Sequence, residues 1–344
     1  MNFISSYVLF FFKIFTICAL ILITFLICLS ITRKKHKKKF ELDVVSLNDH
    51  YTCIKNKIIF SMLSEYEKKI WNKRNKTDIK DALKNNIKFF KKNKHFLNNT
   101  KPILYVLDFN GNINATEVES LREEISAIIL VAKKYDEVLL RLESGGGIIN
   151  GYGLASSQLF RLKKHNIYLT VSVDKIAASG GYMMACVANH IIASPFSVLG
   201  SIGVVAQIPN FYKLLKKNNI DMELHTAGSY KRTLTIFGEN TIEARKKFCT
   251  DLNFAHSLFK KFVHDMRPLL NIEEVSTGEH WFGSTALEKG LIDSIGTSDD
   301  FIMSKMKNFS ILKIKYTNKK TALDSLFLTL KKNIEHVICK FLKI

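Results

Sequence analysis

Ile103-Leu104-Tyr105-Val106-Leu107, followed by Asp108-Phe109-Asn110-Gly111, is the stretch that decides the fold of this 344-residue chain. A short apolar and aromatic run that ends in turn residues is typical of a strand buried on both faces of a parallel sheet. The stretch also marks a change in composition, because the residues before it are rich in Lys and Asn. The domain that carries the chemistry is therefore predicted to begin near residue 101.

The segments after this strand alternate between helical and strand patterns. Apolar residues from Val118 to Ala132 recur at helical spacing, with Asn114 or Thr116 as the N-cap. Strands that alternate with helices are typical of a parallel sheet, so the predicted fold class is α/β. The further predicted elements are a strand at Val138-Leu140, a helix over 149–164, a strand at Ile167–Val173, a helix near Asn210–Asn218, a strand at Met222–His225 and a helix over Thr241–Met266.

The N-terminal segment is long and apolar. Residues from Ile14 to Thr32 carry no charge, and a helix of roughly 20 such residues spans the ~30 Å of hydrocarbon in a bilayer. The run ends in Arg33-Lys34-Lys35-His36-Lys37-Lys38-Lys39 and not in a small-residue cleavage site, so residues 1–32 are predicted to be an uncleaved transmembrane anchor. Basic flanks favour the cytoplasmic side, which leaves the side of the following domain open.

The formal net charge of +20 is concentrated after the predicted anchor. Between Arg33 and Thr100 there are 19 Lys and Arg residues against 7 Asp and Glu. Because this segment lacks zinc-finger spacing and the patterns of RNA-binding modules, we expect no nucleic-acid site. The predicted domains are a basic, partly helical linker over 33–100 near anionic lipid, a catalytic domain over 101–310 and an amphipathic helical tail over 311–344.

Cysteine and histidine spacing argues against metal chemistry. The six cysteines are scattered, and the ten histidines include no His-x-x-x-His pair beside a Glu of the metalloprotease kind. We therefore expect no metal.

Two glycine-rich loops are candidates for catalysis. Ser144-Gly145-Gly146-Gly147 lies between a strand and a helix, where backbone N–H groups can bind an oxyanion or a phosphate, although a structural turn explains it equally well. Ser179, in Ala178-Ser179-Gly180-Gly181-Tyr182, follows a strand and precedes a helical run. This position suits a nucleophile because helix-start amides can stabilise an oxyanion, but a helix-capping turn would have the same pattern.

A serine nucleophile needs a base, and Lys231 in Gly228-Ser229-Tyr230-Lys231-Arg232 is one of few downstream candidates. A lysine accepts a proton near neutral pH only where burial or a neighbouring cation lowers its pKa from about 10.4. Taken by itself, such a residue is more simply a surface lysine.

Four motifs together resemble the Ser-Lys peptidases of the signal peptide peptidase A (SppA) family. In chain order they are Glu143-Ser144-x-Gly-Gly, Ala178-Ser179-Gly180-Gly181-Tyr182, Gly200-Ser201-Ile202-Gly203-Val204 and Ala227-Gly228-x-Tyr230-Lys231. The resemblance covers most of the chain and is closest to an inner-membrane member, since it extends to the anchor, the basic linker and Thr277-Gly278-Glu279-His280-Trp281-Phe282-Gly283.

The resemblance implies a ClpP/crotonase-like fold with an N-terminal transmembrane helix. It implies a membrane-anchored endopeptidase of the bacterial inner membrane that cleaves signal-peptide remnants or other hydrophobic peptides without a cofactor. It also implies a homo-oligomer in which serine and lysine meet across a subunit boundary. The implied site residues are the nucleophile Ser179, the general base Lys231 and the oxyanion-hole amides of Gly146 and Gly180, with Gly147 as the alternative donor.

One residue departs from the family pattern, and three other functions fit parts of the sequence. Gly145 stands where the family usually has proline, which predicts a more flexible loop. A Ser-His-Asp peptidase would need His190 or His225 as its base. A crotonase-like acyl-CoA enzyme would need acidic residues that the sequence around Ser179 lacks after Asp174. A decayed peptidase retained as a membrane scaffold is the third alternative.

Overall fold

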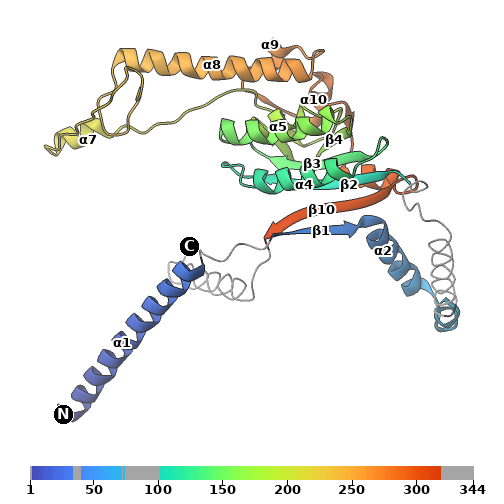
Figure 1. Cartoon of the computed structure of the whole chain (residues 1–344), viewed down its shortest axis with the longest axis horizontal. Coiled ribbons are helices and arrows are strands. Elements are labelled where there is room, and N and C mark those ends of the chain that lie inside the picture. Colours follow the sequence, from blue (N-terminus) through green and yellow to red (C-terminus); the bar gives the residue numbers. More distant parts are fainter. Residues whose placement is uncertain (1, 34–39, 72, 74–100, 319–344) are drawn as a thin grey trace. The chain divides into compact units, whose positions relative to one another are not determined.

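A computed structural model describes residues 2–33, 40–71, 73 and 101–318 (Figure 1). It divides the chain into two compact units, one of which is Leu42–Tyr316 and the other Met1–Glu41 with Thr317–Ile344. The second unit contains helix α1 (Asn2–Arg33). Among the described residues, no helix is long and apolar enough to cross a membrane. The amphipathic helix predicted at Thr321–Ile344 lies outside the described residues.

A ten-stranded sheet is the main element of the fold, with a path in the order β1-β10-β2-β3-β4-β6-β9. Pairing is parallel from β10 through to β9. A branch leaves this path, since β5 pairs with β3 and β7, and β7 pairs antiparallel with β8. The strands are β1 (Phe40–Ser46), β2 (Ile103–Gly111), β3 (Glu137–Ser144), β4 (Tyr168–Val173), β5 (Ile176–Ala178), β6 (His190–Ala193), β7 (Val198–Gly200), β8 (His280–Phe282), β9 (Ser294–Ile295) and β10 (Ser310–Asn318).

The strand predicted at the start of the domain is β2, and its two faces enter two different cores. Tyr105, Leu107 and Phe109 belong to the main core, whereas Leu104 and Val106 belong to a smaller core on the other face. Burial on both faces explains why the sequence of β2 is apolar throughout and does not alternate with polar residues. The predicted α/β class is confirmed.

Helices cover both faces of the sheet. The main core includes side chains of α4, α5, α6 and the C-terminal part of α8, while Ile302 of α11 and Leu47 and Tyr51 of α2 pack into the smaller core. The helices of the unit Leu42–Tyr316 are α2 (Leu47–Met62), α4 (Val118–Val131), α5 (Ile149–Lys164), α6 (Gly180–Ala185), α7 (Tyr212–Lys217), α8 (Ile242–Met266), α9 (Ile272–Val275), α10 (Gly283–Glu288) and α11 (Ser298–Lys305). The residue before α4 is Glu117, so neither Asn114 nor Thr116 is its N-cap.

Part of the segment predicted as a linker over 33–100 is a strand and a helix, β1 and α2. Asn48 of α2 explains their attachment, because its side-chain amide donates to the carbonyls of Met306 and Phe309 and its carbonyl accepts from the amide of Ile311. The domain also extends past its predicted end at residue 310, since β10 pairs with β2. These attachments depend on contacts about 260 residues apart in the chain, which local composition does not reveal.

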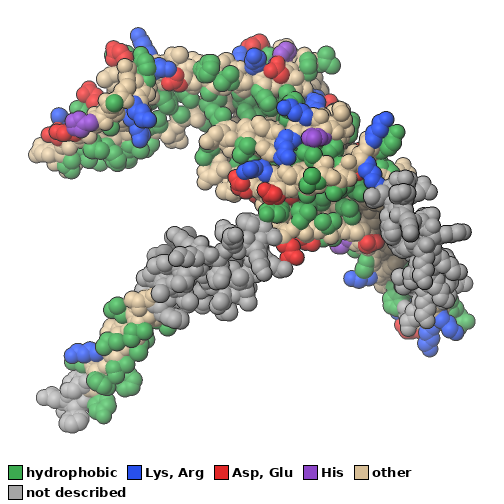
Figure 2. Space-filling view, viewed as in Figure 1, with side chains coloured by type: hydrophobic (Ala, Val, Ile, Leu, Met, Phe, Trp, Pro, Cys, Tyr) green, Lys and Arg blue, Asp and Glu red, His purple; other side chains and the backbone are tan. Residues whose placement is uncertain are grey.

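The stretch from Gly203 to Leu258, here called the arm, contains α7 and most of α8. The structure describes every one of these residues, and none of them is buried. Large apolar side chains are nevertheless exposed along it, including Val205, Ile242 and Phe254 (Figure 2). The predicted helix near Asn210–Asn218 is α7, but Met222–His225 has no regular structure because none of the strands that the structure describes pairs with it.

An ion pair fixes the C-terminal end of α8 to the sheet. Arg267, the C-cap of α8, donates two hydrogen bonds of 2.8 Å to the carboxylate of Asp293, which also accepts from the amide of Ile191 in β6. Burial raises the pKa of Asp293, but the hydrogen bonds from Arg267 and Ile191 outweigh it and hold this pKa below its ordinary value. The buried end of α8, near Val263, is therefore held where the arm begins to leave the core.

Replacing Arg267→Met should destabilise the fold by about 2–4 kcal/mol, because a partly buried carboxylate loses its partner. The matched change Lys260→Met, which breaks an exposed pair with Glu273, should cost less than about 1 kcal/mol. The pKa of Asp293 is lower in the folded state than in the unfolded state, so the ion pair adds stability at pH values above the ordinary carboxylate pKa. This stability is lost as the pH falls through the pKa of the folded state. The midpoint temperature of thermal unfolding should therefore fall more steeply between pH 7 and pH 3 in the wild type than in Arg267→Met. Equal midpoints for the two variants would contradict this role.

Candidate functional site

Ser179 lies at the junction of β5 and α6. Its backbone has φ 51° and ψ −118°, a conformation that non-glycine residues rarely adopt. Two backbone bonds hold it there, because its N–H donates to the carbonyl of Gly200 at 2.8 Å and its own carbonyl accepts from Met183 at 3.0 Å. The side chain is half-buried. Backbone strain of this kind concentrates at functional sites, where surrounding contacts over-determine the conformation.

The glycine loop Ser144–Gly147 comes directly against Ser179. A side chain at Gly146, whose φ is +89°, would place its Cβ 2.7 Å from both the Ser179 Cβ and the Gly180 nitrogen. The pairing of Ser144 in β3 with Ala177 in β5 produces this approach, because both chains turn just beyond the paired residues. The structure thus brings together three of the four predicted site residues.

The amides near Ser179 differ in how they are engaged. Gly180 is the first residue of α6, and first-turn amides have no acceptor within the helix. The Gly146 N–H donates to the Ser144 hydroxyl at 3.1 Å. Gly147 is exposed and packs so tightly that an added Cβ would lie 2.1 Å from the Ile113 carbonyl oxygen. The loop can therefore present an amide from Gly146 or from Gly147.

A buried tyrosine that the sequence reasoning missed supports this loop. The Tyr152 hydroxyl of α5 lies 2.5 Å from the Ser144 hydroxyl and donates to the carbonyl of Asn112 at 2.8 Å. Its ring lies beneath Gly180, where an added Cβ would be 2.4 Å from the ring carbon Cγ. Burial raises the pKa of Tyr152 even though the bond to Ser144 acts in the opposite direction. The sequence signal was a tyrosine one helical turn after the glycine loop.

Lys231 lies in the arm and its side chain is exposed. The adjacent Tyr230 ring lies under the Lys247 ammonium at 5.3 Å, in the second turn of α8. The nearest buried residue of α8 is Phe259, roughly 18 Å further along the helix axis at 1.5 Å per residue. Within residues 101–318, no hydrogen bond or ion pair joins the Lys231 side chain to Ser179. In Figure 1 this yellow segment lies beside the N-terminal end of α8, away from the sheet.

The histidines that an alternative Ser-His-Asp site would require lie elsewhere. His190 Nε2 forms a 2.9 Å hydrogen bond with the Ser294 hydroxyl, and its ring faces Asp293. His225 is exposed and pairs with Glu223. In the described part of the chain, neither histidine forms a hydrogen bond with Ser179, and no group of three or more His, Cys, Asp or Glu side chains could hold a metal.

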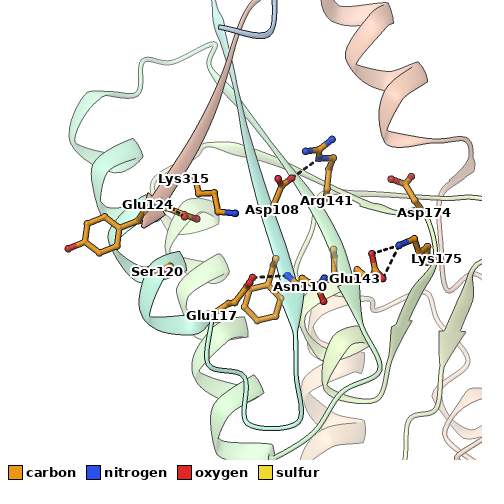
Figure 3. A pocket seen from close by; sticks show the side chains of 13 residues that line it. Asp108, Asn110, Glu117, Ser120, Glu124, Arg141, Glu143, Asp174, Lys175 and Lys315 are labelled. Carbon is orange, nitrogen blue, oxygen red and sulfur yellow. Dashed lines mark hydrogen bonds and ion pairs between the residues drawn. The ribbon is translucent and has the colours of Figure 1, made fainter. Parts of the chain in front are cut away.

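A polar pocket of about 520 Å³ lies where β2 and β10 diverge beyond their paired residues (Figure 3). Two carboxylates accept hydrogen bonds from backbone amides there. Glu117, the N-cap of α4, accepts from Asn110, and Glu124 of α4 accepts from Tyr316, both at 2.8 Å. Burial raises the pKa of Glu124 to about 7. Three ion pairs lie in and beside the pocket, namely Arg141–Asp108, Lys313–Asp108 and Lys175–Glu143. None of the predicted site residues lines it, so this pocket is not the nucleophile site.

Comparisons with known proteins agree with these motifs. Residues 2–159 match the family model described as peptidase family S49 N-terminal, and residues 161–311 match peptidase family S49. The chain is 74% identical over 305 residues to "Probable protease SohB" of Buchnera aphidicola subsp. Schlechtendalia chinensis, which covers 89% of this chain and all of that protein. It is 48% identical to the protein of the same name from Haemophilus influenzae, with 92% and 90% of the two chains covered.

A solved mutant structure of the 1510-N membrane-bound stomatin-specific protease in complex with a substrate peptide is 13% identical, with a TM-score of 0.41. That match covers 67% of this chain and 99% of the other. The family predicted from the four sequence motifs is confirmed by the family models and the curated relatives, and serine protease function is supported at family level. The chain belongs to peptidase family S49.

Proposed function

We propose that this chain is a serine endopeptidase in which Ser179 is the nucleophile and Lys231 the general base. The observation that carries the proposal is the close approach of Gly146 to Ser179 and Gly180. A half-buried serine on a strained backbone, beside helix-start amides, is what acyl transfer requires of a nucleophile and its oxyanion hole. Family membership supports the same class of reaction.

In the proposed reaction the Ser179 hydroxyl attacks a peptide carbonyl while Lys231 takes the hydroxyl proton. Lys231 then delivers this proton to the leaving amine, and water releases the acyl-enzyme. The negative charge that develops on the carbonyl oxygen is stabilised by the Gly180 amide and by one amide of the glycine loop. Gly146 serves as that donor if it shares or gives up its bond to Ser144, and Gly147 is the alternative.

The arm supports a homo-oligomer in which Lys231 reaches the Ser179 of a neighbouring copy. A stretch of more than fifty residues with no buried side chain gains little stability from its own chain. Its exposed apolar side chains instead favour burial against a second subunit (Figure 2). Contact across the boundary would also give Lys231 the burial that a lysine base needs.

The surface beside the glycine loop supports hydrophobic peptides as substrates. Ile113 and Ile148 lie next to each other, joined by a 2.9 Å backbone hydrogen bond, and their side chains are 71% and 48% exposed. Exposed branched apolar side chains at the edge of a site favour apolar substrate residues. Signal-peptide remnants are one class of such peptides.

Anchoring in a bacterial inner membrane through α1 is the cellular part of the proposal. Its support comes from the sequence, because the residues from Ile14 to Thr32 carry no charge. The two relatives named SohB that are compared above are bacterial.

A catalytically inactive scaffold of the same fold is the second candidate function. It is favoured by Gly145, where the loop has lost a proline restraint, and by the absence of a Ser179–Lys231 bond within the described residues of one chain. The following variants separate the two candidates.

Ser179→Ala should lower kcat for a fluorogenic apolar peptide by at least about 10³-fold, because the nucleophile is lost. Ser157→Ala is the matched control, since this exposed serine of α5 bonds only the Gly153 carbonyl. It should leave kcat unchanged. Hydrolysis that persists in Ser179→Ala after purification would place the nucleophile elsewhere, and a wild-type oligomer without activity would favour the scaffold.

Mixing Ser179→Ala with Lys231→Ala subunits should restore activity. Each variant alone should be inactive, but in randomly mixed oligomers about one quarter of the sites would combine an intact serine with an intact lysine from the neighbour. A mixture of Ser179→Ala with the doubly substituted chain is the control and should stay inactive. No recovery in refolded, correctly sized mixed oligomers would contradict a dyad shared between subunits.

The full chain, expressed in a bacterium, should remain in the membrane pellet after an alkaline carbonate wash. Replacing Ile21→Lys and Leu22→Lys together should release it, because each charge costs about 2.5–3.5 kcal/mol at the centre of a membrane helix. A chain that lacks residues 2–33 is the soluble reference. Carbonate extraction of the unaltered chain would contradict the anchor.

A further inference from the structure

The Ser144–Gly147 loop is held by a short chain of hydrogen bonds that starts in α5. The Tyr152 hydroxyl donates to the Asn112 carbonyl at 2.8 Å. The Ser144 hydroxyl lies 2.5 Å from the tyrosine oxygen and 3.3 Å from the Gly111 carbonyl, and either oxygen can accept its one proton. The Ser144 oxygen then accepts the Gly146 N–H at 3.1 Å. Three hydrogen bonds in series, through the Tyr152 and Ser144 hydroxyls, therefore connect the Asn112 carbonyl before α5 to the Gly146 amide of the loop.

The Tyr152 side chain also limits how closely the start of α6 can approach α5. Tyr152 is fully buried, and its Cβ, Cγ and Cδ2 atoms would all lie within 2.8 Å of a Cβ added at Gly180. Phe109 of β2 also packs against the ring, with centroids 6.4 Å apart in an edge-to-face arrangement. The ring therefore cannot move closer to Gly180 without breaking close packing.

We propose that Tyr152 is a positioning residue for the oxyanion hole, because its hydroxyl fixes the glycine loop through Ser144 and its ring fixes the amide of Gly180. One side chain would thereby set the spacing between the two halves of the hole. This inference rests on the proposed peptidase function. It adds a role for the Ser144 hydroxyl, which relays the constraint to the loop.

The loop needs this external restraint because its own sequence supplies none. Three consecutive glycines have more backbone freedom than any other residues. Gly145 is exposed and an added Cβ there would meet nothing closer than 3.9 Å. Gly146 is held at φ +89° only by its neighbours. Because Ser144 occupies the Gly146 N–H, the Gly147 amide is the donor that this arrangement leaves to the oxyanion hole. An amide that must be held within a fraction of an ångström then depends on the hydrogen bonds that Ser144 and Tyr152 make to the preceding residues of the loop.

Tyr152→Phe tests the proposal, since it removes one oxygen and keeps the ring under Gly180. We expect amide hydrogen exchange of a peptide spanning residues 143–149 to become at least about 10-fold faster. We expect kcat to fall about 10- to 100-fold with KM within about 2-fold, because the loss falls on transition-state stabilisation. Tyr105→Phe is the matched control, a buried tyrosine whose hydroxyl interacts with Asp136 and does not touch the loop. It should change neither measurement.

Ser144→Ala should reproduce the effect, and the double variant Tyr152→Phe/Ser144→Ala should be no worse than the more impaired single variant, because both residues act through one relay. Unchanged loop exchange in Tyr152→Phe, an unchanged kcat, additive effects in the double variant or an equal loss in Tyr105→Phe would each overturn the proposal. Exchange measured in a Ser179→Ala background does not depend on activity. A wild type without hydrolysis would therefore refute the proposed function while the exchange result still decides whether Tyr152 positions the loop.

Discussion

The site depends on one strand pairing, the parallel contact between Ser144 at the end of β3 and Ala177 in β5. Because both strands run in the same direction, the residues that follow them leave the sheet at the same edge, and the glycine loop meets Ser179 there. At this edge the two segments come so close that several positions have no room for a side chain. A Cβ at Gly181 would lie 2.5 Å from the Ser144 carbonyl oxygen, just as one at Gly146 would meet Gly180. Close packing therefore explains Gly146, Gly180 and Gly181 before any chemistry is considered, whereas Gly145 has room for a side chain.

The arm contrasts with this closely packed edge. The sequence motifs predict that Ser179 and Lys231 share one site. In the structure, however, Lys231 lies in the arm, near the N-terminal part of α8, where no residue is buried. The Arg267–Asp293 pair fixes only the far end of that helix. An extension with exposed apolar side chains and one fixed end is suited to contact a neighbouring subunit. This asymmetry between the two ends of α8 supports the oligomer in the proposal.

The sequence was a good guide wherever the signal was local. Apolar periodicity predicted α5 and α8 almost to the residue, and the apolar run at Ile103 predicted β2. Prediction failed where distant contacts decide the structure. Asn48 attaches a Lys-rich segment to β10, and the strand expected at Met222–His225 is missing because none of the described strands pairs with it. For the candidate site, glycine spacing predicted the loop and Ser179, which the structure brings into close approach. It gave no sign of Tyr152, which packs beneath two separate turns.

The most direct test of the account is the site of covalent labelling by a peptidyl phosphonate with apolar residues. Such a probe phosphonylates an activated serine and leaves its oxygen in the oxyanion hole, so it reports the nucleophile and the amides together. With the intact full-length protein, peptide mapping by mass spectrometry should find one adduct per subunit, on Ser179. An adduct on another residue would contradict the assignment of Ser179 as the nucleophile. The absence of any adduct would also contradict it, provided that the wild type assembles correctly, to the same oligomer as the control Tyr105→Phe.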